Sequence, residues 1–338
     1  MTDTVAMTVE EIHQLAVQVL AANGCDDANA NAIATTVSTA ERDGSESHGL
    51  FRIPGYVGSM RSGKVNGYAN PQHEAVTPAV MRINGDNGYT PLAIERGIPL
   101  LAEAAKTYGI AALSIINTFH FAALWPETEA LADHGLVGMA FTAYKPKVAP
   151  AGAKEALFGT NPVSVAWPRP GKTPWVFDMA TSSRALGDIQ IAARDGHDVP
   201  VGTGLDSNGN PTTDPSQIAN GGVLLPFGGH KGSAIATMVE LFAAGLTGEQ
   251  FSFEAGETDV EDGGPARGGE LLLALSPAII ADGGIAGADW QAHCETFFAR
   301  LTGLNGVRLP GQRRHQNRHN KQPRQVNAGL LDQIRQLI

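Results

Sequence analysis

The sequence lacks the features that define several large classes of protein. Its two cysteines, Cys25 and Cys294, lie far apart, and neither has histidines at metal-ligand spacing. A disulfide framework and a zinc site are therefore not indicated, and we predict no bound metal. The first residues form no basic and apolar leader, and no apolar run approaches the ~20 residues that cross a bilayer. We therefore expect a cytoplasmic protein with no membrane partner.

Positive charge is also scarce in this chain. It has 24 Lys and Arg against 34 Asp and Glu, which gives a formal net charge of −10. Such a chain repels nucleic acid and acidic membranes, so the expected partner is a small molecule and not a nucleic acid. Hydrophobic residues make up 43% of the 338 positions. That content allows a large core, and the length suits about two domains.

The amino-terminal part of the sequence predicts helices. Thr8 and Glu11 form a capping box at the start of an amphipathic stretch. A second helix follows and is expected to end at Gly44, because glycine readily adopts the backbone conformation that terminates helices. A third helix, over 90–108, contains Pro99, which should kink or split it. The first ninety residues are expected to be largely helical.

The middle of the chain predicts short strands between helices. The strands are expected over residues 110–116, 136–143, 163–167, 175–179 and 270–275, and the helices over 121–134 and 231–246. This order predicts a mixed α/β fold. No G-x-G-x-x-G motif follows an early strand, so a nicotinamide cofactor would need a scaffold other than a Rossmann domain.

Two charged segments are expected to have little regular structure. The acidic, glycine-rich residues 256–269 predict a mobile, solvated loop. The basic residues 313–321 suit either a solvated tail or a contact with phosphate.

A hydroxyl, an imidazole and a guanidinium follow closely after the second helix. Ser47 and His48 can pass a proton, and Arg52 offers a planar fork that suits a carboxylate. The alternative is a helix end at which His48 caps carbonyl groups and Arg52 is solvated. A Ser-His hydrolase is disfavoured, because adjacent residues rarely orient a nucleophile toward its base and no G-x-S-x-G motif surrounds Ser47.

Glycines lead directly into the helix expected over 231–246. Segment 228–233 would bring together free backbone amides, the positive end of the helix dipole and the charge of Lys231, which suits a phosphate group. It is not a P-loop, because Gly232 follows Lys231 where that motif requires Ser or Thr. The alternatives are a helix cap that holds nothing and a nucleotide-binding protein that is not an enzyme.

Four further polar residues lie next to expected strands. His120 follows a strand and opens a helix, so it either faces a pocket or caps the helix. The hydroxyl of Thr160, in a turn before a strand, suits a carboxylate oxygen. Asp178 ends a strand, and Asp188 follows ten positions later. Each of these acids is either functional or a buried group satisfied by backbone amides.

In their order along the chain, these segments resemble the malate/L-lactate dehydrogenase-like oxidoreductases from about Thr8 to Arg314. Within that family the chain looks most like the Δ1-piperideine-2-carboxylate/Δ1-pyrroline-2-carboxylate reductases. Asp188 is the sharpest discriminator, because many hydroxyacid members carry Lys there. The segments that carry the resemblance are Ser47–Gly49 with Arg52, His120–Phe121, Gly159–Pro162, Asp178–Thr181, Gly228–Gly232 and Leu309–Gly311.

The resemblance implies a non-Rossmann NAD(P)-binding fold and a homodimer. Residues 1–75 with 300–338 would form a helical domain, and residues 76–299 a mixed-sheet cofactor domain. The implied reaction reduces Δ1-piperideine-2-carboxylate to L-pipecolate or Δ1-pyrroline-2-carboxylate to L-proline, with NADPH preferred and NADH weaker. The alternative within the family is a 2-hydroxyacid dehydrogenase of the malate, lactate or ureidoglycolate type.

The resemblance also implies roles for matching positions. His48 would donate the proton, with Ser47 and Asp188 as its relay, and Arg52 and Thr160 would bind the substrate carboxylate. A 2′-phosphate would meet Arg313 with Lys145 or Lys147. The implied cofactor contacts are His120, Phe121, Ala122, Ala123, Leu124, Asp178, Met179, Ala180, Gly229, His230, Lys231, Gly232, Ser233, Leu309, Pro310, Gly311 and Arg313.

Overall fold

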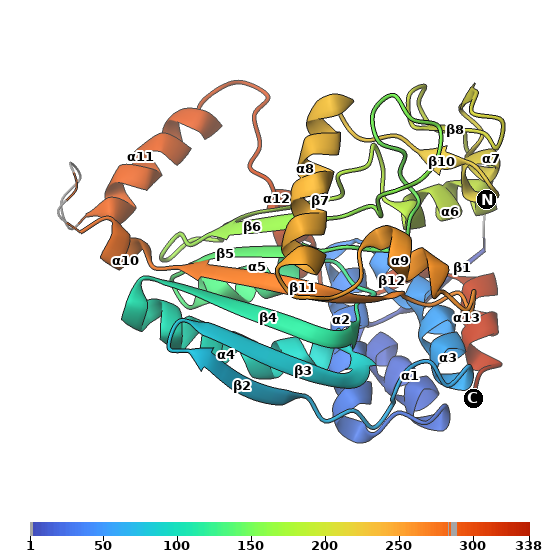
Figure 1. Ribbon diagram of the computed structural model, residues 1–338, viewed down its shortest axis with the longest axis horizontal. Helices are drawn as coiled ribbons and strands as arrows, with labels where there is room; N and C mark the ends of the chain where they lie inside the picture. Colours follow the sequence, from blue (N-terminus) through green and yellow to red (C-terminus); the bar gives the residue numbers. More distant parts are fainter. Residues whose placement is uncertain (1–2, 283, 285–288) are drawn as a thin grey trace.

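A seven-stranded mixed sheet forms the centre of the protein (Figure 1). The computed structural model describes residues 3–282, 284 and 289–338. Strands β3 and β4 are parallel, and the other neighbouring strands are antiparallel. In their order across the sheet, the strands are β2 (Gln72–Thr77), β3 (Val80–Tyr89), β4 (Ile110–Phe119), β11 (Arg267–Leu275), β5 (Val137–Thr142), β6 (Val163–Trp167) and β7 (Trp175–Met179).

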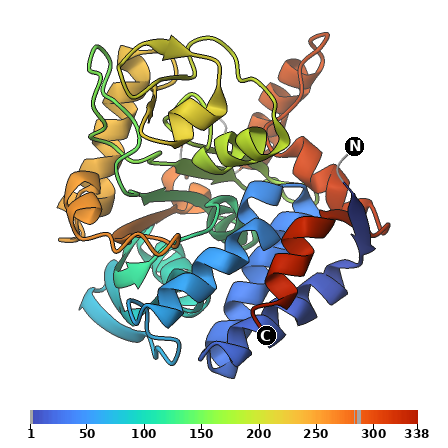
Figure 2. The ribbon, with the colours of Figure 1, turned by 90° about the vertical axis from the view of Figure 1, so that its right-hand side faces the viewer.

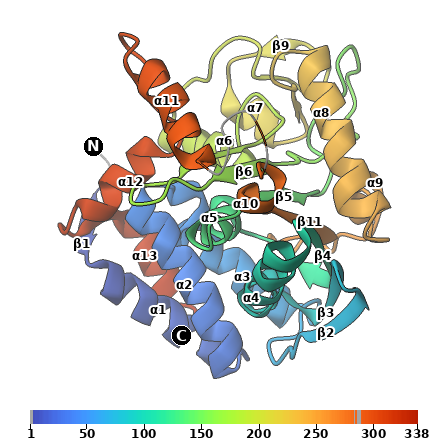
Figure 3. The ribbon, with the colours of Figure 1, turned by 90° about the vertical axis from the view of Figure 1, so that its left-hand side faces the viewer.

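Helices cover both faces of this sheet because its central strands are apolar on both sides. On one face, α4 (Thr90–Tyr108) and α5 (Trp125–Asp133) share a core with the sheet that includes Leu101, Leu113 and Leu272 (Figure 3). On the other face, α8 (His230–Glu240) and the π-helical turn Leu241–Gly245 pack on β5, β6 and β11. The central strands are therefore buried on both faces, as the mixed α/β prediction requires.

The two ends of the chain meet in a helical layer beside the sheet (Figure 2). Strand β1 (Thr4–Met7) pairs antiparallel with β12 (Arg324–Asn327), so residues more than three hundred positions apart are neighbours. One apolar core joins this layer. The predicted domain boundary remains a prediction. The helices of the layer are α1 (Val9–Ala22), α2 (Asp27–Asp43), α3 (Ile53–Arg61), α12 (Gln312–His319) and α13 (Ala328–Arg335).

A smaller lobe follows strand β7 and carries its own core around Ile189, Ile218 and Leu224. Helix α11 (Trp290–Thr302) extends from the opposite end of the molecule (Figure 1). The lobe contains α6 (Leu186–Asp195), α7 (Pro215–Ala219) and the sheet β10-β8-β9 (Val223–Leu224, Gly204–Leu205, Pro211–Thr212), and the short helices α9 (Ser252–Glu257) and α10 (Pro277–Ile280) flank β11. No helix of the described residues is long and apolar enough to cross a membrane.

Local signals were reliable for several elements. The capping box of Thr8 and Glu11 opens α1, and Gly44 ends α2 in the left-handed conformation at φ 78°. Strands β6 and β7 have the predicted bounds. The expectation that the first ninety residues are largely helical is wrong, because β2 and β3 lie there.

Two further expectations about regular structure need correction. Helix α4 runs through Pro99 without a break. Pro99 lies on the exposed side, so water can satisfy the carbonyl it leaves unpaired while the opposite face stays packed. The acidic segment 256–269 is not a solvated loop, because Lys64 donates to Asp262 at 2.7 Å and Lys145 is bonded to Asp259.

The basic segment 313–321 is not a solvated tail, and its contact with phosphate remains a prediction. Most of it forms α12, in which Arg314 and Arg318 face the protein while Arg313 is exposed. Arg318 is paired with Asp43 and Glu129, and Arg314 donates to the carbonyl of Val176 at 3.0 Å. Its positive charge therefore holds α12 on the body of the protein.

Candidate active site

A cavity of about 580 Å³ opens where the helical layer, the sheet and the lobe meet. It collects polar residues from segments far apart in the sequence. The predicted site residues that line it are Ser47, His48, Arg52, His120, Phe121, Ala122, Ala123, Thr160, Asp178, Met179, Ala180, Asp188 and Arg313. The structure thus brings the residues predicted for catalysis, for the substrate carboxylate and for part of the cofactor to one place.

Ser47 and His48 lie on a tight turn that follows α2. The chain leaves the helix at Gly44 and forms a 3-10 turn over Glu46–His48. The Oγ atom of Ser47 is 3.2 Å from Nδ1 of His48. Behind the turn, Leu50 donates its backbone N–H to the Glu41 carboxylate at 2.8 Å. This bond anchors the turn, so the hydroxyl and the imidazole are held together at the cavity wall.

Arg52 places a cation in the cavity without an acidic partner. Its guanidinium lies 4.5 Å from the centre of the Phe121 ring. Its Nε atom is buried and makes no hydrogen bond, and no carboxylate of the described residues forms an ion pair with it. A guanidinium held on an aromatic ring with open donors is suited to a planar anion such as a carboxylate.

The surroundings of His48 disfavour its charged form. Burial, followed by the positive charges of Arg52 and His120, lowers its pKa to about 3. The imidazole is therefore neutral at neutral pH when the cavity holds only protein groups. An anion bound at Arg52 would cancel one of these causes and raise the pKa of His48.

Asp188 reaches the cavity from the first turn of α6. Gly187 makes this approach possible, because a Cβ atom there would lie 2.9 Å from both the Cβ of Ser47 and a guanidinium nitrogen of Arg52. Among the described residues, no hydrogen bond joins the Asp188 carboxylate to Ser47 or His48. Its predicted place in a proton relay therefore remains a prediction.

Asp178 has a local structural task. Its carboxylate accepts the backbone N–H groups of Leu124 and Trp125 at 2.8 and 3.0 Å, at the start of α5. Burial nevertheless raises the pKa of Asp178 to about 6. The bonds fix the segment that carries His120 into the cavity. Leu124 itself packs in the core with α4, so its side chain does not line the cavity.

The predicted phosphate segment lies next to the cavity and does not line it. Gly229 caps α8, and residues 229–231 are exposed. The backbone N–H of Phe227 donates to Thr181 at 3.0 Å, which joins this segment to the strand end at the cavity wall. Residues Gly229, His230, Lys231, Gly232, Ser233, Leu309, Pro310 and Gly311 are absent from the lining, and their predicted cofactor contacts remain predictions.

The cations proposed for a 2′-phosphate divide into two groups. Arg313 lines the cavity. The ammonium group of Lys145 is paired with Asp259, and that of Lys147 donates to the carbonyl of Ala219 at 3.0 Å; neither residue lines the cavity. Arg314 also lines it, which sequence reasoning missed because nothing in 313–321 indicates which arginine faces inward. Tyr144 also lines the cavity and was not predicted; its ring stacks parallel to that of Phe121.

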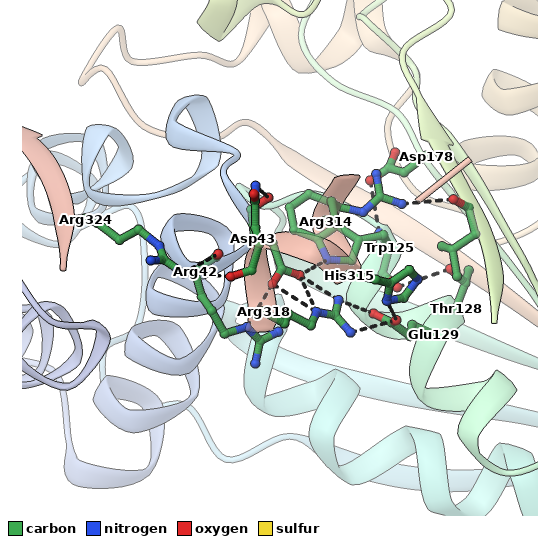
Figure 4. Close-up of polar contacts among 12 residues, drawn as sticks. Arg42, Asp43, Trp125, Thr128, Glu129, Asp178, Arg314, His315, Arg318 and Arg324 are labelled. Carbon is green, nitrogen blue, oxygen red and sulfur yellow. Dashed lines mark hydrogen bonds and ion pairs between the residues drawn. The ribbon is translucent and has the colours of Figure 1, made fainter. Parts of the chain in front are cut away.

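A buried ion-pair network supports the site from behind (Figure 4). Arg318 of α12 pairs with Asp43 at the end of α2 and with Glu129 of α5. Trp125 donates its indole N–H to Asp43 at 3.2 Å. The network therefore joins three elements directly behind the turn that carries His48.

Replacing Arg318 with glutamine is expected to lower the free energy of unfolding by about 3 kcal/mol, because it leaves buried carboxylates unpaired. Arg318 and Arg42 lower the pKa of Asp43 although burial opposes them. This stabilisation is present above the unfolded pKa of about 3.9 and is lost as the pH falls through the folded value. Urea unfolding of the wild type and of the Arg318 variant from pH 7 to pH 3 measures this stabilisation. The exposed Arg335→Gln is the control, and equal losses in the two variants would contradict the role.

Comparison with known proteins agrees with this architecture. The family model described as malate/L-lactate dehydrogenase matches residues 7–335. A Δ1-pyrroline-2-carboxylate reductase of Ancylobacter novellus is 44% identical over 94% of this chain and 92% of its own length. A second, from Pseudomonas fluorescens, is 42% identical over the full length of both chains. The crystal structure of Δ1-piperideine-2-carboxylate reductase from Pseudomonas syringae pv. tomato has a TM-score of 0.90 at 40% identity, covering 99% of this chain and 100% of the other.

The fold and the site therefore define an oxidoreductase of the non-Rossmann type that the sequence predicted. The chain belongs to the malate/L-lactate dehydrogenase family. Within that family, the relatives described above are reductases of cyclic imine carboxylates.

Proposed function

We propose that this protein uses a nicotinamide cofactor to reduce the C=N bond of Δ1-pyrroline-2-carboxylate to L-proline and of Δ1-piperideine-2-carboxylate to L-pipecolate. The observation that carries the proposal is the guanidinium of Arg52, held on Phe121 without an acidic partner and close to Ser47 and His48. Such a site suits a small planar anion that must receive a proton. The relatives named for these substrates support the same reaction.

In the proposed reaction, Arg52 and the hydroxyl of Thr160 bind the substrate carboxylate. His48 donates a proton to the ring nitrogen while the neighbouring carbon receives a hydride, so that C=N becomes CH–NH. Carboxylate binding cancels the charge of Arg52 and thereby favours protonation of His48. Ser47 and Asp188 would orient and stabilise the imidazolium. The cofactor supplies the hydride when it is bound.

The residues at the cavity fit a dinucleotide. Residues 120–123 and 178–180 give the cavity a partly apolar lining, and Arg313 and Arg314 bring positive charge to it. We propose that these segments, with the adjoining residues 229–233 and 309–311, contact NADPH. NADPH is preferred in this proposal because Arg313 is available for the 2′-phosphate.

Replacing Arg313 with alanine is expected to lower kcat/KM for NADPH at least about tenfold, because a charge-assisted hydrogen bond to phosphate is lost. The value for NADH should change little. Steady-state kinetics with both cofactors measure the difference. Lys321→Ala, at an exposed position just after α12, is the matched control. An equal loss for both cofactors would refute the assignment of Arg313.

A substrate panel tests the proposed reaction itself. Absorbance of NADPH is followed with Δ1-pyrroline-2-carboxylate, Δ1-piperideine-2-carboxylate, pyruvate and oxaloacetate. Turnover of the cyclic imines at a kcat/KM well above that of the keto acids supports the proposal. The reverse order would assign the protein to the 2-hydroxyacid dehydrogenases of its family.

We also propose a cytoplasmic homodimer. Large apolar side chains are exposed after the π-helical turn, on α9, and on and just after α11, among them Leu246, Phe253, Phe297 and Leu304. Exposed apolar groups of this size favour burial against another chain. Light scattering at micromolar concentration tests the dimer, and a monomer mass would refute it.

A further inference from the structure

One residue of the cavity wall, His120, and two glutamates behind it are titratable side chains that the proposed reaction does not use as acids. His120 follows β4, Glu127 lies in the first turn of α5, and Glu270 lies on β11. The Nε2 atom of His120 is 3.7 Å from Oε1 of Glu127 and 3.8 Å from Oε2 of Glu270. We call these three residues the buried triad.

The buried triad contains more acid than its surroundings can neutralise. Glu270 is 0% exposed, Glu127 4% and His120 8%. In the part of the chain that the structure describes, neither oxygen of Glu270 has a hydrogen-bond partner, nor has Oε2 of Glu127. No Lys or Arg there pairs with either glutamate. Burying two such carboxylates as anions is very costly, so the triad must retain protons.

Local structure directs these side chains toward one point. The pairing of β11 with β4 shifts register between Gly268 and Glu270, and such a bulge re-aims the side chain beside it. Glu127 faces the same point because Asp178 fixes the start of α5. The triad is thus built by the packing of three elements and is not a chance surface cluster.

The environment of the buried triad is mostly acidic or neutral. Asp178 at the end of β7 and Tyr56 of α3 face it, and His48 lies across the cavity. The charge of Arg314 of α12 acts on Asp178. Arg52 lines the same cavity as His120, and its guanidinium lies over the ring of Phe121, the residue that follows His120. Any negative charge that develops on the triad therefore acts on the site where Arg52 would hold an anion.

We propose that the buried triad positions His120 and controls the charge of the cavity. Glu127 and Glu270 hold the imidazole at the wall, and the protons shared by the three side chains keep negative charge away from Arg52. Its effect on substrate binding rests on the proposed function, because the substrate there is a carboxylate.

The bonding of His120 favours protons over a metal ion in the buried triad. In the neutral imidazole, the backbone N–H of Ala122 donates to Nδ1 at 3.5 Å, which leaves Nε2 as the protonated nitrogen facing the carboxyl groups. A metal on Nε2 would require the proton on Nδ1, directed at another N–H. The two carboxylates raise the pKa of His120 against the effect of burial. Burial raises the pKa of Glu270 to about 8, although His120 opposes it.

Replacement of Glu270 by glutamine tests the control of charge, because glutamine imitates the protonated acid and cannot ionise. In the wild-type enzyme, KM for Δ1-pyrroline-2-carboxylate should rise about tenfold between pH 7 and pH 9, as one nearby group ionises. In E270Q, KM at pH 9 should stay within about twofold of KM at pH 7. Glu129→Gln is the matched control: it removes a carboxyl group from α5 and weakens the Arg318 network, but should keep the wild-type pH ratio.

A second measurement needs neither substrate nor cofactor. In ¹⁵N-histidine NMR of the free protein, His120 should titrate above the ordinary imidazole value of about 6.5, because the two carboxylates raise its pKa. In the double variant E127Q/E270Q it should titrate below that value, because burial then acts without the two carboxylates. If cyclic imines are not substrates, this spectrum still tests the triad. Either of two results would overturn the proposal: a wild-type spectrum in the double variant, or a rise of KM with pH in E270Q as large as that in the wild type. A divalent metal bound stoichiometrically to the triad would overturn it as well.

Discussion

Replacing His48 with alanine is expected to lower kcat for cyclic imine reduction by about 10²-fold or more. That is the usual contribution of a positioned acid. Alanine removes the imidazole that Ser47 holds at 3.2 Å. Because Arg52 and the cofactor segments are untouched, KM and the affinity for NADPH should change much less. Steady-state kinetics and cofactor titration measure the two effects separately.

The matched control for this variant is His134→Ala, which removes an exposed imidazole after α5. Its kcat should equal that of the wild type within about twofold. If His48→Ala lowers kcat by less than about threefold, His48 is not the donor. A large parallel loss of NADPH affinity would instead indicate a collapsed turn.

The charge state of His48 gives a further way to examine the same residue. Its pKa of about 3 in the protein alone means that the proton must arrive when an anion binds. A planar carboxylate such as pyrrole-2-carboxylate should therefore raise the pKa of His48, which NMR of labelled histidine can follow. The substrate would in this way create the acid that protonates its ring nitrogen.

What the sequence could predict of the fold depended on how local the signal was. Thr8 and Gly44 act within one helical turn, so the ends of α1 and α2 were predictable. Strand β2 was missed because all its residues are exposed, and an edge strand that buries neither face shows no apolar alternation. Pro99 shows the converse, since the packed face of α4 outweighs a local break signal.

The site divides in the same way. Ser47, His48 and Arg52 lie within six positions on two consecutive 3-10 turns, so their types and spacing carried the prediction. Glu270 and Glu127 reach His120 only because β11 lies beside β4 and α5 packs behind it. Strand pairing over about 150 positions has no local signature, so the buried triad could not have been predicted without the fold.

Replacing Arg52 with lysine is expected to raise KM for the imine carboxylate at least about tenfold while kcat falls less. A lysine keeps the charge but cannot form two parallel hydrogen bonds to a carboxylate. Nor can it lie flat on the Phe121 ring, where the guanidinium now stands at 4.5 Å. The substrate would bind more weakly and in more orientations.

Comparison of Arg52→Lys with Arg61→Lys separates recognition from general electrostatics. Arg61 lies at the far end of α3, the helix that begins directly after Arg52, and contacts Asn23 near the surface. Its conservative replacement keeps the net charge and should leave KM unchanged. An unchanged KM in Arg52→Lys would mean that the carboxylate is bound elsewhere in the cavity. The link between substrate binding and the protonation of His48 would then fail as well, because it depends on the anion cancelling the charge of Arg52.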